Sequence, residues 1–172
     1  MRCDKRGGTT DKTLDDLLAI EEIKNLRNGY AAHLDSQEVD ALAALFTEDA
    51  VCEFGENYGT WHGRTEIATN YRAAVQHIGA TFDAIHIMSN PWIRIQSPTT
   101  AVGRWYLMDW ATRQAPVNGL VTRTGHDHPL MYLGIYEDDY RKVDGKWLIS
   151  YTKLHFLWPD RVFTGLRHPG LV

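Results

Sequence analysis

The feature that most constrains the fold is a change of hydrophobic periodicity near Gly79. Before this residue apolar side chains recur at helical spacing, and after it they alternate at strand spacing. The order predicts an α+β fold, in which helices pack on one face of a curved, mixed β-sheet. A chain of 172 residues fits one domain. We expect a flexible arm over residues 1–12, the domain over 13–160 and a C-terminal tail over 161–172.

Three helices are predicted before Gly79, over residues 13–34, 36–46 and 65–78. The first has an apolar stripe at helical spacing, made of Ile20, Ile23, Leu26, Tyr30 and Leu34. Charged residues are expected to face away from this stripe, namely Glu21, Glu22, Lys24 and Arg27.

The predicted strands are one short segment between the helices and five more after Gly79. They cover residues 50–54, 82–88, 92–96, 101–110, 130–142 and 146–158. Turns are expected at Ser89-Asn90-Pro91 and at residues 97–99, and a long loop at 112–129. Asp144-Gly145 is a strong hairpin signal between the last two strands. Such a sheet curls around the first helix and leaves a cone whose open end is an apolar pocket.

Charge and motif content exclude several function classes. A net charge of −4 argues against a nucleic-acid partner. No apolar run reaches membrane-spanning length and no secretory signal begins the chain, so we expect no membrane association and a cytoplasmic location. No GxGxxG, Walker, GxSxG or HExxH motif is present, so we expect neither a nucleotide cofactor nor a covalent serine mechanism. His126-Asp127-His128 lacks an evident third ligand, so we expect no metal.

Two candidate residues lie near the end of the first helix. Tyr30 is on the buried stripe, where it is either a core tyrosine or a hydroxyl that donates to a substrate oxygen. Asp35 is either the N-cap of the next helix, with Glu38 three residues on, or a carboxylate that orients a histidine. Ser36 could cap the helix instead, which would free Asp35 for the second role.

Two further candidates lie on predicted strands. His86 alternates with Ile85 and Ile87 and is either a structural histidine or a general base tuned by Asp35. Asp109 is either past the end of its strand, in water, or a pocket acid that shares a face with apolar residues. Together the four residues offer a phenol, an imidazole and two carboxylates, which suffice for acid–base chemistry.

Three larger side chains are secondary candidates for contact with a substrate. Trp61 and Trp105 could wall a pocket for a flat, polycyclic ligand, or could be ordinary core residues. His155, on the last predicted strand, could also face the pocket.

Several segments resemble the SnoaL-like group of the NTF2-like superfamily, and in particular its bile-acid 7α-dehydratase and scytalone dehydratase branch. The similarity covers roughly residues 15–158 and is carried by residues 20–35, Phe46-Thr-Glu-Asp-Ala-Val51, residues 59–67, residues 99–109 and residues 140–147. It implies a cone-shaped NTF2-like barrel, cofactor-free catalysis and often a homotrimer. The branch's catalytic tyrosine, aspartate, histidine and acid fall on Tyr30, Asp35, His86 and Asp109. The loop at 112–129 is longer here than in the bile-acid enzyme.

The resemblance favours a lyase that removes water from a hydroxylated, carbonyl-bearing polycyclic or aromatic substrate. In that reaction His86, oriented by Asp35, is the base, Tyr30 binds the oxygen that gains negative charge, and Asp109 assists the leaving hydroxyl. An isomerase or polyketide cyclase using the same base stays open. So does a non-catalytic ligand-binding protein, or a small subunit like that of ring-hydroxylating dioxygenases.

Overall fold

The computed structural model of the protein describes residues 13–112 and 131–169. Its helices are α1 (Leu14–Asp35), α2 (Val39–Ala44), α3 (Gly55–Tyr58) and α4 (Gly63–Ile78). Its strands are β1 (Phe46–Glu53), β2 (Thr60–His62), β3 (Ala84–Ser97), β4 (Thr100–Ala111), β5 (Met131–Val143) and β6 (Lys146–Trp158). The predicted arm over 1–12 lies outside the described residues, as does nearly all of the predicted loop over 112–129, with His126 and His128.

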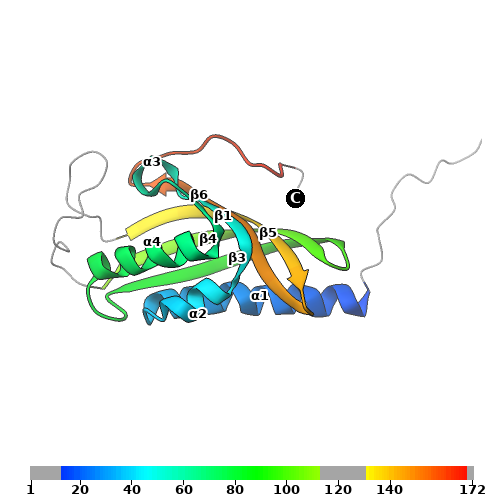
Figure 1. The fold of residues 1–172 in the computed structure, drawn as a ribbon. Helices are drawn as coiled ribbons and strands as arrows, with labels where there is room; N and C mark the ends of the chain where they lie inside the picture. Colours follow the sequence, from blue (N-terminus) through cyan, green and yellow to red (C-terminus); the bar gives the residue numbers. More distant parts are fainter. Residues whose placement is uncertain (1–12, 113–130, 170–172) are drawn as a thin grey trace, which may run out of the picture.

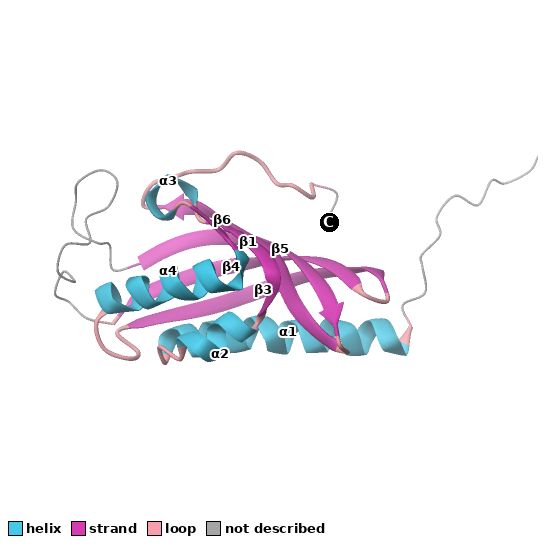
Figure 2. Cartoon of the chain, in the orientation of Figure 1, coloured by secondary structure: helices cyan, strands magenta, loops and turns pink. Residues whose placement is uncertain are grey.

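The strands form one curved, mixed sheet in the order β2-β1-β6-β5-β4-β3 (Figure 1). β1 pairs with β6 in parallel, and the other neighbouring strands are antiparallel. The helices pack against this sheet, and the short α3 lies beside the end of β6 (Figure 2). The predicted α+β class is therefore confirmed. The expected barrel is corrected to an open sheet, because β2 and β3 are edges that do not pair with each other.

The first helix forms as predicted, and its start is fixed by a capping box. The Thr13 hydroxyl accepts from the Asp16 N–H, and the Asp16 carboxylate accepts from the Thr13 N–H. One side-chain direction was predicted wrongly. Arg27 is fully buried, because it follows Ile23 by four residues and precedes Tyr30 by three, which places it on the apolar stripe.

The second helix is shorter than predicted, and the strand after it begins earlier. Gln37 adopts a left-handed φ of 60°, so the helix begins only at Val39, after an N-cap, Glu38, whose side chain makes no capping hydrogen bond. Phe46 is buried at the start of β1, paired with Ile149 of β6. Its apolar side chain therefore belongs to the strand and not to the helix.

The predicted turn at Ser89-Asn90-Pro91 is wrong, since β3 runs through it. The strand accommodates these residues by a bulge between Ser89 and Trp92, with Asn90 at a φ of 50°. Pro91 is tolerated because β3 is an edge strand and one side of its backbone needs no ladder partner.

The two predicted turns between later strands are confirmed. Residues 98–99 connect β3 to β4, and Asp144-Gly145 connects β5 to β6. Asp144 and Gly145 both have positive φ, 49° and 78°, as a two-residue hairpin turn of type I′ requires. The core lies between sheet and helices, with Ile23, Leu42 and Ile149 fully buried. None of the helices in the described ranges is long and apolar enough to cross a membrane.

Candidate active site

A cavity of about 420 Å³ lies between the helices and the sheet. Its lining is mainly apolar and aromatic, and includes Leu34, Phe54, Trp61, Leu107 and Phe156. Four of its polar lining residues are Tyr30, Asp83, His86 and Asp109. A mostly apolar cavity with a few converging polar groups is the usual form of a small-molecule site.

The strongest polar contact at this cavity joins Asp35 to His86. Asp35 is the last residue of α1, and His86 is the third residue of β3. The distance from Asp35 Oδ1 to His86 Nδ1 is 2.6 Å, and the His86 backbone N–H donates to both carboxylate oxygens at 3.1–3.2 Å. The two side chains are about one-tenth exposed. Asp35 thus holds both the ring and the backbone of His86 and does not cap α2.

Asp109 lies directly across the strand pair from His86. The two residues are register partners in β3 and β4, and His86 Nε2 is 3.6 Å from Asp109 Oδ2. β4 continues to Ala111, so Asp109 is within the strand and its side chain shares the inward face with Leu107. The imidazole therefore has one carboxylate at each ring nitrogen.

These carboxylates determine how readily His86 is protonated. Burial favours the neutral imidazole, but the charges of Asp109 and Asp35 and the hydrogen bond that the ring donates to Asp35 outweigh it and raise the pKa of His86 above its usual value. Because Asp35 accepts at Nδ1, the neutral form of the ring carries its lone pair on Nε2, on the side of Asp109. The arrangement can take up a proton at Nε2 and stabilise the resulting charge.

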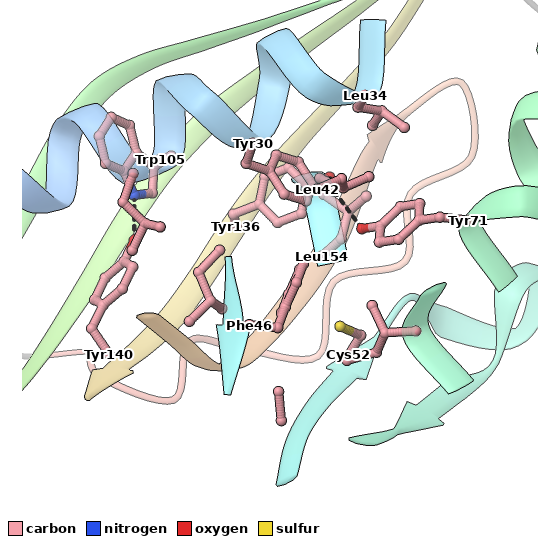
Figure 3. Close-up of a cluster of buried hydrophobic side chains, with 14 of the residues drawn as sticks. Tyr30, Leu34, Leu42, Phe46, Cys52, Tyr71, Trp105, Tyr136, Tyr140 and Leu154 are labelled. Atoms are coloured by element: carbon pink, nitrogen blue, oxygen red, sulfur yellow. Dashed lines mark hydrogen bonds between the residues drawn. The ribbon is translucent and has the colours of Figure 1, made fainter. Parts of the chain in front are cut away.

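Tyr30 reaches the same cavity from α1 and is not alone there. Its hydroxyl lies 2.7 Å from the Tyr71 hydroxyl of α4 and 3.3 Å from the Tyr136 hydroxyl of β5. Figure 3 shows the three side chains pointing toward one another from their separate elements. All three line the cavity and are at most 4% exposed.

The secondary candidates separate into one at the cavity and two away from it. Trp61 lines the cavity, and its indole N–H donates to the Tyr58 carbonyl at 2.7 Å. Trp105 is buried elsewhere and donates to the Tyr140 hydroxyl at 2.9 Å (Figure 3). His155 faces away from the cavity, because it follows the cavity-lining Leu154 on β6, and its Nε2 pairs with Glu137 at 2.8 Å.

Sequence reasoning missed several cavity residues, although their signals were present. Tyr71 follows Ile67 by four residues, so helical spacing places it on the apolar face of the predicted third helix. Tyr132 and Tyr136 alternate with period two on β5 and share the cavity face. Tyr58 comes from α3, a short helix with no apolar periodicity to predict it.

No group of three or more His, Cys, Asp or Glu residues that could hold a metal ion occurs within residues 13–112 and 131–169.

The SnoaL-like domain model matches residues 15–153 of the chain. The chain belongs to this family. The matched range extends from the first turn of α1 into β6, and so contains Asp35, His86 and Asp109.

Solved structures with the same fold include two named for elimination reactions. A putative scytalone dehydratase from Novosphingobium aromaticivorans shares 23% identity with a TM-score of 0.69, over 89% of this chain and 92% of that one. The hexachlorocyclohexane dehydrochlorinase LinA-type3 from Novosphingobium barchaimii shares 18% identity with a TM-score of 0.68, over 89% and 95%. A cystatin-like protein of unknown function from Nostoc punctiforme shares 22% identity with a TM-score of 0.61, over 84% and 92%.

Proposed function

We propose that this SnoaL-like protein is a lyase that removes water from a hydroxylated, carbonyl-bearing polycyclic or aromatic substrate without a cofactor. The observation that carries the proposal is the Asp35–His86–Asp109 array beside an apolar cavity. Two fold neighbours support the proposal, because both are named for elimination reactions: a dehydratase removes water, and a dehydrochlorinase removes hydrogen chloride.

In this mechanism His86 is the general base. Asp35 accepts the Nδ1–H and keeps the ring oriented, so Nε2 is free to remove a proton from the carbon beside the substrate carbonyl. The imidazolium that forms is stabilised by the carboxylate 2.6 Å from Nδ1. The proton is made removable by the carbonyl, whose oxygen gains negative charge as the C–H bond breaks.

Two other residues complete the elimination. Tyr30 donates a hydrogen bond to the oxygen on which charge accumulates. Asp109 accepts a hydrogen bond from the departing hydroxyl, and the imidazolium gives that hydroxyl the proton taken from carbon. The hydroxyl leaves as water while the electron pair of the C–H bond forms the new C=C bond. His86 Nε2 and Asp109 Oδ2 are 3.6 Å apart, so a hydroxyl held by Asp109 lies close to the imidazolium proton.

The cavity walls support a flat substrate. The Phe156 ring stacks on the Tyr58 ring with centroids 6.0 Å apart. The Tyr132 ring meets the Phe156 ring edge-on, with centroids 5.7 Å apart. Trp61 adds a fourth aromatic side chain. Aromatic walls of this kind suit ring systems better than extended chains.

The direct test is turnover of a panel of β-hydroxy ketones fused to one or more rings. Product formation appears as the ultraviolet absorbance of the conjugated enone. We expect His86→Gln to reduce kcat by at least about 10²-fold, because a positioned base contributes about 10²–10⁴-fold. His33→Gln is the matched control, since His33 of α1 also pairs with a carboxylate, that of Glu38 at 2.7 Å, but does not line the cavity.

Full turnover by His86→Gln would refute the base assignment. An isomer or a cyclised product in place of the enone would instead indicate an isomerase or cyclase that uses the same base.

We propose further that the protein assembles as a homo-oligomer, with a trimer favoured. The outer face of β3 and β4 supports this assembly, because it carries Ile85, Ile87, Tyr106 and Trp110 with 38–45% exposure. Ile85 is the register partner of Trp110, so the side chains of these two residues are neighbours. A patch of this kind on a sheet is typical of protein–protein contact.

A further inference from the structure

The Tyr30, Tyr71 and Tyr136 hydroxyls, here termed the tyrosine cluster, contain one more hydrogen than their mutual bonds use. Each phenol carries one hydroxyl hydrogen, and the two contacts of 2.7 and 3.3 Å use two of the three. Within residues 13–112 and 131–169 these hydroxyls have no other hydrogen-bond partner. Whichever hydroxyl donates in each of the two hydrogen bonds, one O–H remains unused. All three phenols line the cavity. The cluster therefore offers a donor to a bound molecule.

A buried cation lies against two of these rings. The Arg27 guanidinium carbon is 4.1 Å from the centroid of the Tyr30 ring and 3.9 Å from that of Tyr136. Arg27 is fully buried, and its three guanidinium nitrogens make no hydrogen bond to any residue that the structure describes. A cation over a phenol draws electron density from the ring and makes its O–H a stronger donor. Burial raises the pKa of Tyr30 and Tyr136, and Arg27 opposes this shift.

The ion pair with Asp138 compensates the charge of this arginine but leaves its hydrogen-bonding groups unmet. Its nearest anion is Asp138, 3.4 Å from Nε, which is too far to satisfy the guanidinium geometry. The Asp138 carboxylate already accepts from the Tyr140 and Thr152 hydroxyls, at 2.6 Å each. Buried guanidinium nitrogens without partners are costly, so their retention beneath the cavity calls for an explanation.

We infer that the tyrosine cluster, with Arg27 stacked beneath it, is an oxyanion-binding site for a substrate whose oxygen becomes an enolate or is a phenolate. Tyr71 and Tyr136 are then substrate-binding residues beside Tyr30, and Arg27 is a positioning residue that acts through the phenols. The cluster donates hydrogen bonds and transfers no proton. The inference rests on the proposed function for its place in elimination, but the binding of an oxyanion needs no turnover.

The test compares two small probes, 4-nitrophenol and 4-nitroanisole, which differ in whether the oxygen can ionise. The absorption spectrum separates nitrophenolate from nitrophenol, so a pH titration of the bound probe gives its pKa in the site. We expect the protein to bind the phenolate at least about tenfold more tightly than the anisole and to lower the pKa of the bound phenol.

Single substitutions then identify the donors. Tyr71→Phe and Tyr136→Phe should each weaken phenolate binding about tenfold and leave anisole binding unchanged. Tyr140→Phe is the matched control, because Tyr140 is equally buried and hydrogen-bonded but does not line the cavity. Equal binding of the two probes by the wild type, or an undiminished phenolate preference in both variants, would overturn the inference.

Arg27 is tested through charge and not only through loss of the side chain. The double variant Arg27→Met/Asp138→Asn removes both buried charges, and we expect it to raise the pKa of the bound nitrophenol. Asp138→Asn alone leaves the cation uncompensated and should lower that pKa; it carries the test if circular dichroism shows that the double variant is unfolded. A bound-probe pKa that moves in neither variant would show that Arg27 has only a structural role.

The two proposals can fail separately. If no ring-fused hydroxy ketone is turned over while the phenolate preference depends on Tyr71 and Tyr136, the elimination is refuted and the oxyanion site stands. If His86-dependent turnover persists without any phenolate preference, only the oxyanion site is refuted.

Discussion

Replacement of Asp35 by Asn should lower the pKa of His86 below the ordinary histidine value. The substitution keeps the size of the side chain and removes the charge 2.6 Å from Nδ1. In the wild type, burial lowers the pKa and the two carboxylates raise it, with a net increase above 6.5. Without Asp35 the burial effect is opposed by Asp109 alone, whose nearest oxygen is 3.6 Å from Nε2.

The size of the change follows from the separation and burial of the pair. Opposite unit charges about 4 Å apart attract by about 4 kcal/mol at an effective dielectric of about 20, so loss of the Asp35 charge removes an interaction of this order. The side chains are 9–10% exposed, so screening by solvent is limited. The Asn amide oxygen can still accept from Nδ1–H, which retains part of the effect. We therefore expect the pKa of His86 to decrease, by less than the full loss of this attraction would give.

The assay is an NMR titration of the His86 imidazole protons in the wild type, Asp35→Asn and Asp109→Asn. Both variants should lower the pKa, since both remove a carboxylate that faces the ring. An unchanged or raised His86 pKa in Asp35→Asn would refute the reasoning.

The same shift has a consequence for stability. The pKa of His86 is higher in the folded protein than the unfolded value of about 6.5. Protonated His86 therefore stabilises the fold, and this contribution is complete at pH values below the unfolded pKa. The contribution is lost as the pH rises through the folded-state pKa. In Asp35→Asn this part of the pH dependence should vanish or reverse sign, which urea unfolding at a series of pH values would measure.

Two further predictions concern the outer face of the sheet. The Glu137 carboxylate accepts from the backbone N–H groups of residues 167 and 168. Glu137→Gln should therefore loosen the C-terminal segment and speed trypsin cleavage after Arg161 by about tenfold. An unchanged cleavage rate would show that other contacts hold this segment. Ile87→Glu should convert the proposed oligomer to monomer in size-exclusion chromatography with light scattering, whereas Val143→Glu, equally exposed at the hairpin turn, should not; a monomeric wild type would exclude the assembly.

Most of the fold was predictable because its signals are local. The apolar stripe of α1 and the Asp144-Gly145 turn each depend on a few neighbouring residues, and both were predicted correctly. The errors arose where distant pairing overrides local preference. Ser89-Asn90-Pro91 has the composition of a turn, yet pairing with β4 draws it into a bulged edge strand. Phe46 extends the helical pattern, yet pairing with β6 makes it a strand residue.

The site shows the same division between local pattern and tertiary contact. Alternation correctly predicted that His86 faces away from the exposed Ile85 and Ile87. No local pattern states which carboxylate meets the ring, because Asp35 and His86 are 51 residues apart in the sequence. The burial of Arg27 was missed for a different reason. Its charge led to the prediction that it faces solvent, although its spacing places it on the buried stripe of α1.

Asp35 shows why the site and the fold are coupled at this point. A carboxylate in the last turn of a helix opposes the helix dipole, so α1 alone would not favour this residue at this position. It becomes favourable only when β3 supplies the N–H and the ring of His86 as donors. The Asp35 carbonyl also accepts from the Phe82 N–H at 2.8 Å, so the same residue fixes where the chain enters β3. In the described part of the chain Asp109 makes no comparable hydrogen bond to another element's backbone through its side chain, and its strand, β4, is held by ladders to β3 and β5. Any loss of ring orientation should therefore appear in Asp35→Asn and not in Asp109→Asn, although both variants remove one negative charge from the imidazole.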